Sequence, residues 1–193
     1  MLSTLASTHT SQTGPRLRQR LGGLDRGLTR RVALDWRHPR WLVLALSALS
    51  LTGNYGILWF VLAVVPWLAG AGRPRTVFLF VAGAVFATEI ITYLIKIAVG
   101  RRRPSEGAGA PPALIPLPVS HSFPSSHASM GMVGAISMGS LYPPLLPALL
   151  ALVAVLAFSR VYLGVHYVTD VVAGLLLGAV LGVAYVLVSV LAT

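Results

Sequence analysis

The chain has 193 residues, of which 55% are hydrophobic and 10% charged, and its mean hydropathy is +0.78. So few charges exclude an ordinary soluble domain, whose surface would need many more. The sequence has no cysteine, which excludes disulfides, thiol chemistry and cysteine-ligated metals. Long charge-free runs predict an all-α fold: a polytopic membrane helical bundle of about five transmembrane helices, each needing about 20 apolar residues, plus an N-terminal interfacial helix.

The N-terminal segment is polar and basic, and eight of the fifteen Lys and Arg residues lie between Arg16 and Arg40. Residues 1–24 are expected to be a disordered basic tail, and residues 1–32 lack the apolar core of a cleavable secretory signal. The net charge of +10 could suggest nucleic acid, but no basic face with interleaved aromatic residues accompanies it. We therefore expect this cluster to contact membrane lipids and no nucleic acid.

Residues 25–193 are expected to form a single membrane domain. It starts with an interfacial helix over residues 25–52, because the apolar part of that segment is only about twelve residues long, too short to span the membrane. Full spans are then expected at about residues 54–72, 76–100, 126–142, 144–165 and 168–191. With this order, every strongly polar cluster of the domain falls at one membrane face.

Glycine recurs every four residues in the last predicted span, at Gly174, Gly178 and Gly182. Small residues at this spacing let membrane helices approach one another closely. We therefore expect this glycine stripe to be a face that packs against another helix.

The first polar cluster, KIAVGRRRP, ends the second predicted span. Lys96 and Arg103 are nearly two helical turns apart, so both cations can point to one side. The alternative interpretation is that these basic residues only mark the end of the span at the membrane surface. Lys96 is, however, the only lysine in the chain and lies inside the membrane boundary, where a buried cation needs an anion. Glu89 lies two turns deeper, so the expected partner is a bound ligand.

The second cluster, FPSSHAS, opens the third predicted span. Pro124 followed by Ser125 and Ser126 is typical of a helix start, whose free backbone N–H groups can bind an anion. His127 lies in the first turn, at the rim of that anion site. A purely structural histidine is the alternative, and this motif alone does not exclude it.

The third cluster, SRVYLGVHYVTD, joins the last two predicted spans. His166 and Asp170 are four residues apart on one helical face, so the carboxylate can accept from the imidazole and leave the other ring nitrogen as base or nucleophile. The alternative is a structural pair, in which the two polar side chains hydrogen-bond each other near the lipid headgroups and take no part in a reaction. One histidine and one aspartate do not close a metal coordination shell, so neither a metal nor another cofactor is expected.

Together the three clusters bring cations, a helix N-terminus and two histidines to one membrane face. Three cationic side chains suit the peripheral oxygens of a phosphoryl group. One histidine can attack phosphorus and the other can protonate the leaving oxygen, without a metal. The residue types therefore favour phosphoryl transfer.

The order and spacing of these motifs resemble the signature of the type 2 phosphatidic acid phosphatase family, which also includes the vanadium haloperoxidases. The motifs are Lys96-x6-Arg103-Pro104, Pro124-Ser125-Ser126-His127 and Ser159-Arg160-x5-His166-x3-Asp170. The resemblance covers about residues 34–190 and implies the membrane-bound lipid phosphatase branch. One departure is Ser126, where the family usually has glycine, although serine still offers its backbone N–H.

The resemblance also implies a role for each motif residue. His166 would be the nucleophile that forms a phosphohistidine, Asp170 would orient it, and His127 would be the general acid. The phosphate-binding residues would be Lys96, Arg103, Ser125, Ser126 and Arg160.

The resulting expectation is a membrane-embedded phosphatase for a lipid phosphomonoester or pyrophosphate, with phosphatidate, phosphatidylglycerol phosphate and polyprenyl-type lipids as candidate substrates. A haloperoxidase-like enzyme and a non-catalytic lipid-binding or transport protein are the alternatives. We expect a multi-pass protein of the cytoplasmic membrane. By the positive-inside rule its site faces the cytoplasm if residues 41–52 stay in the interface, and faces outward if they cross. The sequence does not specify the lipid or the oligomeric state.

Overall fold

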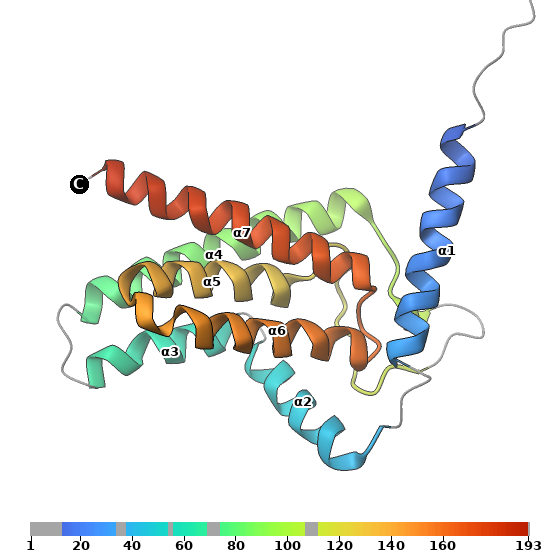
Figure 1. The fold of residues 1–193 in the computed structure, drawn as a ribbon, viewed down its shortest axis with the longest axis horizontal. Helices are drawn as coiled ribbons and strands as arrows, with labels where there is room; N and C mark the ends of the chain where they lie inside the picture. The colour runs from blue at the N-terminus through green and yellow to red at the C-terminus, as the bar shows by residue number, and fades with distance from the viewer. Residues whose placement is uncertain (1–12, 34–37, 54–55, 69–73, 107–111, 193) are drawn as a thin grey trace, which may run out of the picture.

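The computed structural model describes residues 13–33, 38–53, 56–68, 74–106 and 112–192, and these residues form helices and loops with no strand. The elements are α1 (Thr13–Ala33), α2 (Arg40–Thr52), α3 (Ile57–Leu68), α4 (Pro74–Val99), η2 (Pro104–Glu106), α5 (Ser126–Leu141), η3 (Pro143–Leu145), α6 (Leu146–Tyr162) and α7 (Val168–Leu191). Helices α3 to α7 form one bundle, with α1 beside the end where α7 begins (Figure 1). The predicted all-α membrane bundle is confirmed.

Helix α5 occupies the centre of the bundle. It contacts α3, α4, α6 and α7, and eleven of its 16 residues are buried. A helix enclosed by others need not reach both membrane surfaces by itself. Its 16 residues are fewer than the about 20 of an independent span.

The glycine stripe of α7 packs against α5, as predicted. A Cβ atom added at Gly174 would lie 2.6 Å from the Ser125 carbonyl oxygen, and one added at Gly178 would lie 2.3 Å from the Ser129 carbonyl oxygen. Both distances are shorter than a van der Waals contact, so the absence of a side chain is what lets the two backbones approach this closely. The stripe therefore fixes how α7 lies beside α5.

The outer faces of α4 and α7 are apolar and exposed. The exposed large side chains there include Phe86, Ile90, Leu94, Ile97, Leu176, Val180, Leu187 and Val188. Large apolar faces of this kind are unfavourable in water and suit contact with lipid. Three segments of the described chain are long and apolar enough to cross a membrane: Arg75–Glu106, Pro143–Tyr162 and Val168–Leu191.

The five predicted spans correspond to α3 to α7, but α3 and α5 are shorter than an independent span. A fourth span is obtained among the described residues if α2 and α3, which are bent by 78° relative to each other, count as one broken span. The span predicted over residues 54–72 corresponds to α3, which has 12 residues. Gly56 has a positive φ of 76°, which favours glycine and turns the chain between the two helices. The apolar segment is thus divided between two short helices.

The N-terminal segment also differs from the prediction. Helix α1 begins at Thr13, inside the segment expected to be disordered, and the predicted interfacial helix over residues 25–52 is divided between α1 and α2. Asp25 and Thr29 of α1 are buried because both side chains accept hydrogen bonds from backbone N–H groups at the start of α7. These hydrogen bonds hold α1 against the start of α7. Residues 1–12 of the predicted tail lie outside the described residues.

Candidate active site

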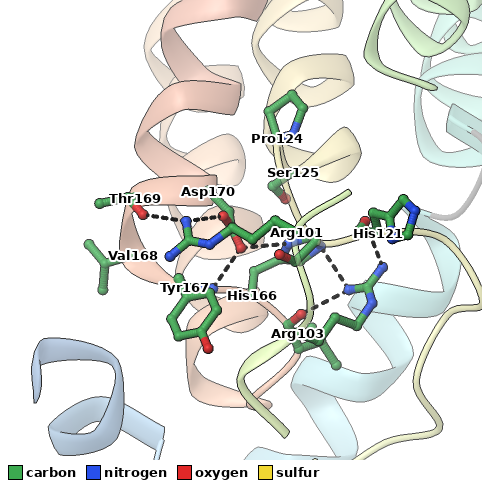
Figure 2. Close-up of polar contacts among 12 residues, drawn as sticks. Arg101, Arg103, His121, Pro124, Ser125, His166, Tyr167, Val168, Thr169 and Asp170 are labelled. Atoms are coloured by element: carbon green, nitrogen blue, oxygen red, sulfur yellow. Dashed lines mark hydrogen bonds and ion pairs between the residues drawn. The ribbon is translucent and has the colours of Figure 1, made fainter. Parts of the chain in front are cut away.

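The three sequence motifs meet at the end of the bundle where α4 and α6 end and α5 and α7 begin (Figure 1, Figure 2). Ser126 is half-buried, and the other predicted site residues are buried, with at most 7% exposure: Lys96, Arg103, Ser125, His127, Arg160, His166 and Asp170. Burying so many ionisable groups is costly unless they are paired, hydrogen-bonded or used in function. The structure brings the predicted residues together, while their roles remain predictions.

His166 and Asp170 form the expected pair at the start of α7. His166 Nδ1 lies 3.5 Å from Asp170 Oδ2. The same Oδ2 accepts a hydrogen bond of 2.9 Å from the Tyr167 backbone N–H, so the carboxylate caps α7 while it faces the imidazole. The backbone N–H groups of Val165 and His166 both donate to the Arg160 carbonyl, at 3.2 Å each. The backbone thus holds both members of the pair in place.

Arg103 lies on the other side of the imidazole (Figure 2). Its Nη1 is 3.3 Å from His166 Nε2 and donates to the Val165 carbonyl at 2.8 Å. Its Nε and Nη2 donate to the Ser120 carbonyl at 3.0 and 2.9 Å. Because a guanidinium only donates, we assign Nε2 of His166 as the unprotonated nitrogen, which leaves the proton on Nδ1, 3.5 Å from Asp170 Oδ2. This is the tautomer that a nucleophilic imidazole needs.

Burial lowers the pKa of His166 well below its usual range, and the cationic groups of Arg160, Arg103 and Lys96 lower this pKa further. Both effects disfavour the positively charged imidazolium. His166 is therefore neutral at physiological pH, and the lone pair of its Nε2 is available for reaction.

Lys96 is bound to the loop that leads into α5. Its Nζ donates to the carbonyls of His121 and Pro124, at 2.9 and 2.7 Å. The sequence predicted a bound ligand as the partner of this buried cation, whereas the structure provides two backbone carbonyls, because the loop returns to the end of α4. An ammonium group has three N–H bonds, so a third donor is available to a ligand.

Helix α2 contributes an unpredicted part of the site. His127 Nε2 lies 3.0 Å from the Ser50 carbonyl oxygen, and Arg160 Nη1 donates to the Ser50 hydroxyl. A Cβ atom added at Gly53 would lie 2.7 Å from the His127 ring, so glycine leaves the space that the imidazole fills. Helix α2 therefore covers the side of the site formed by α5 and α6.

The start of α5 carries donors that fit an anion. The Ser125 N–H donates to the Asp170 carbonyl at 3.0 Å, so the free N–H groups of this helix begin at Ser126. Ser125 Oγ and Arg160 Nε have no hydrogen-bond partner among the described residues. Buried donors without partners are unfavourable unless a ligand accepts from them. These groups are candidates to hold phosphate oxygens.

The predicted site residues did not include Arg101, Asp25 or Ser50. Arg101 Nη1 lies 2.6 Å from Asp170 Oδ1, but its spacing does not distinguish it from the neighbouring arginines. Asp25 and Ser50 lie 76 and 77 residues from their partners Arg101 and His127. No local pattern connects positions so far apart.

Comparison with known proteins identifies the family. A sequence profile described as the PAP2 superfamily matches residues 77–192. The chain is 40% identical over 134 residues to the decaprenylphosphoryl-5-phosphoribose phosphatase of Mycobacterium tuberculosis (strain H37Rv), a match that covers 69% of this chain and 73% of that protein. It is 36% identical over 101 residues to the undecaprenyl-diphosphatase of Sulfolobus acidocaldarius, covering 48% of this chain and 49% of that protein.

Two crystal structures have a similar fold. The first transmembrane PAP2 type phosphatidylglycerolphosphate phosphatase from Bacillus subtilis matches with a TM-score of 0.68 and 22% identity, covering 86% of this chain and 84% of that chain. Aquifex aeolicus LpxE matches with a TM-score of 0.70 and 23% identity, covering 84% of this chain and 94% of that chain. At 22% and 23% identity, the similarity to these two structures shows that the chain has the same fold. Because the profile matches more than half of the chain and the mycobacterial phosphatase is 40% identical, this integral membrane protein belongs to the PAP2 superfamily.

Proposed function

We propose that this PAP2 lipid phosphatase transfers the phosphoryl group of a lipid phosphate to His166 and then hydrolyses the phosphohistidine. The observation that carries the proposal is the position of His166, whose Nδ1 lies 3.5 Å from the Asp170 carboxylate and whose Nε2 lies 3.3 Å from the Arg103 guanidinium. A carboxylate behind an imidazole stabilises the positive charge that develops as the other nitrogen attacks. A guanidinium beside that nitrogen can stabilise phosphoryl oxygens.

The proposed reaction has two steps. In the first, Nε2 of His166 forms a bond to phosphorus as the bond to the leaving oxygen breaks, and His127 gives that oxygen a proton. In the second, water gives a proton to His127 as its oxygen forms a bond to phosphorus and the bond between phosphorus and Nε2 breaks, so that phosphate leaves, His127 regains its proton and His166 returns to its neutral form. The groups proposed to hold phosphate oxygens are the side chains of Lys96, Arg103, Ser125 and Arg160 and the backbone N–H of Ser126.

The proposed substrate is a polyprenyl-type lipid that carries a phosphomonoester or a diphosphate. The relatives reported above are named for decaprenylphosphoryl-5-phosphoribose and undecaprenyl diphosphate. These phosphatase names also favour phosphatase activity over the haloperoxidase and non-catalytic alternatives. The apolar outer faces of α4 and α7 suit a substrate whose tail stays in the bilayer.

A panel of lipid phosphates tests the substrate. Purified protein in detergent micelles is expected to release phosphate from a polyprenyl diphosphate or a polyprenyl-linked sugar phosphate with a higher kcat/KM than from phosphatidate or phosphatidylglycerol phosphate. A preference for the glycerolipids would contradict the proposed polyprenyl substrate, but it would leave the proposed phosphoryl transfer to His166 standing. Failure to release phosphate from any of these lipids would contradict the proposed function itself.

We expect the activity to need no metal ion. In the part of the chain that the structure describes, no group of three or more His, Cys, Asp or Glu side chains could hold one, and two histidines can perform the proposed proton and phosphoryl transfers. Activity is expected to persist in excess EDTA and to be blocked by orthovanadate, which adopts the five-coordinate geometry of the transferring phosphorus. Activity that EDTA removes and a divalent ion restores would point to a different mechanism.

We further propose that the site faces the cytoplasm and that the protein resides in the cytoplasmic membrane. Support comes from α1, which carries several arginines and contacts the site end of the bundle through Asp25, 2.6 Å from Arg101. This contact favours one membrane side for both the basic cluster and the site. The positive-inside rule then favours the cytoplasm, since the predicted opposite face has only Arg73 and Arg75 in the sequence.

Two single cysteines test this orientation, because the chain has no native cysteine. Val119 is fully exposed in the loop that binds Lys96, and Ser140 is exposed at the far end of α5. A membrane-impermeant maleimide added to intact spheroplasts is expected to label Ser140→Cys, and to label Val119→Cys only after permeabilisation. The reverse pattern would show that the site faces outward.

A further inference from the structure

Arg101 bridges two carboxylates that come from different helices. Its Nη2 lies 2.6 Å from Asp25 Oδ2 of α1, and its Nη1 lies 2.6 Å from Asp170 Oδ1 of α7. Its guanidinium also lies over the Tyr167 ring, 4.1 Å from the ring centroid. Figure 2 shows Arg101 reaching Thr169 and Asp170 at the start of α7. One cation is thus shared between the N-terminal helix and the carboxylate that faces His166.

Asp25 is held in this position by the first turn of α7. Its Oδ1 accepts from the Thr169 backbone N–H at 3.1 Å, and its Oδ2 accepts from the Thr169 hydroxyl at 2.6 Å. One turn further along α1, the Thr29 hydroxyl accepts from the Val168 N–H at 3.2 Å. Helix α1 therefore supplies acceptors for the free N–H groups at the start of α7. With an exposure of 4%, Asp25 is almost as deeply buried as Asp170.

The charges of this network act on the pair His166–Asp170. With Asp25, Arg101 and Asp170 all ionised, the network keeps a net negative charge. Without the carboxylate of Asp25, the remaining ion pair would be neutral. A negative charge beside Nδ1 of His166 is what stabilises the imidazole as it becomes positive during attack. Asp25 thus offsets the effect of Arg101 on Asp170.

We infer that Asp25 is a positioning residue for phosphoryl transfer: it anchors Arg101, which orients Asp170 towards His166, and its carboxylate keeps the net charge of the network negative. Helix α1 therefore takes part in organising the active site and is more than a surface helix that contacts lipid. The inference rests on the proposed role of His166, and it does not depend on which lipid is the substrate.

Asp25→Asn tests the inference with little change of shape. The amide oxygen can still accept from Thr169, but the side chain loses its charge and its ion pair with Arg101. The loss of a negative charge favours the neutral form of His166. We expect kcat to fall about tenfold with KM nearly unchanged, and the acid limb of the kcat/KM profile to move to lower pH.

Arg30→Gln is the matched control on the same helix. Arg30 is exposed and lies five residues after Asp25, on a different side of α1. This variant is expected to keep the wild-type kcat, KM and pH profile. Wild-type kinetics in Asp25→Asn, or the same changes in both variants, would overturn the inference.

A second measurement separates the inference from the proposed function. An NMR titration of protein labelled with ¹³C-histidine follows the protonation of His166 without turnover, and the spectrum of His166→Ala assigns its signal. This signal is expected to titrate at lower pH in Asp25→Asn than in wild type. An unchanged titration would overturn the inference even if the phosphatase activity is found. If the titration shifts but the protein hydrolyses no lipid phosphate, the influence of Asp25 on His166 would be supported and the proposed function would be contradicted.

Arg101→Gln completes a double-mutant cycle that is independent of activity. It leaves Asp25 and Asp170 as buried carboxylates without their shared cation, so the melting temperature is expected to fall. Adding Asp25→Asn removes one of these charges and is expected to restore part of the lost stability. Additive losses in the double variant would contradict a shared network.

Discussion

Turnover of the lipid phosphate is expected to fall by about four orders of magnitude or more in His166→Ala, while the protein remains folded. The loss follows from the proposed bond between Nε2 and phosphorus, for which alanine has no replacement. Folding is expected to persist because the imidazole lies in the loop before α7, where its neighbours Arg103 and Asp170 keep their own backbone hydrogen bonds. The variant thus removes a reactive group and leaves the packing between helices intact.

Trapping the intermediate tests this prediction directly. A rapid quench in alkaline denaturant, which preserves phosphohistidine, is expected to give a ³²P-labelled adduct in wild type and none in His166→Ala. His121→Ala is the matched control: its side chain is exposed, and alanine keeps the backbone carbonyl that accepts from Lys96. Full activity in His166→Ala, or an adduct that persists in it, would show that another group is the nucleophile.

Gly178→Val is expected to destabilise the protein by about 3 kcal/mol or more. A Cβ atom at this position would lie 2.3 Å from the Ser129 carbonyl oxygen and 2.9 Å from Met132 Cβ. The closer of these atoms belongs to the backbone of α5, so it cannot move aside as the end of a flexible side chain would. Valine can be accommodated only if α5 and α7 separate, which leaves gaps in the centre of the bundle.

Unfolding in mixed detergent micelles measures this effect. Ala184→Val is the control, because Ala184 is exposed on the same helix and the substitution adds two methyl groups where no helix is in the way. It is expected to unfold within about 0.5 kcal/mol of wild type. Equal stability of Gly178→Val and Ala184→Val would contradict the close contact between α5 and α7.

The packing of α5 against α7 also positions the two histidines. The Ser125 N–H donates to the Asp170 carbonyl at 3.0 Å, which joins the start of α5 to the first turn of α7. His127 follows two residues after Ser125, and His166 lies four residues before Asp170. A separation of the two helices is therefore expected to misalign the proposed nucleophile and general acid as well as to destabilise the fold.

Local pattern was sufficient to predict α7 and the residues at its start. The predicted span over residues 168–191 matches the observed helix Val168–Leu191, because a long charge-free run follows a polar start and nothing interrupts it. The same periodicity predicted the face shared by His166 and Asp170, and the glycine stripe behind them. These features depend on residues a few positions apart, whose relative placement is set by helical geometry alone.

Contacts between distant helices were decided only by the tertiary structure. The sequence predicts an interfacial helix that starts at Asp25 and contact of the basic cluster with lipid. In the structure, Asp25 lies against Arg101 and Thr169, where it accepts from three donors at once. The position of Ser50 beside His127 and Arg160 likewise depends on the turn at Gly56 that separates α2 from α3. Which side chains meet across helices depends on how each helix is rotated about its axis and how far it is shifted along its neighbour. Packing of the whole bundle sets both quantities, and the pattern within any one segment does not contain them.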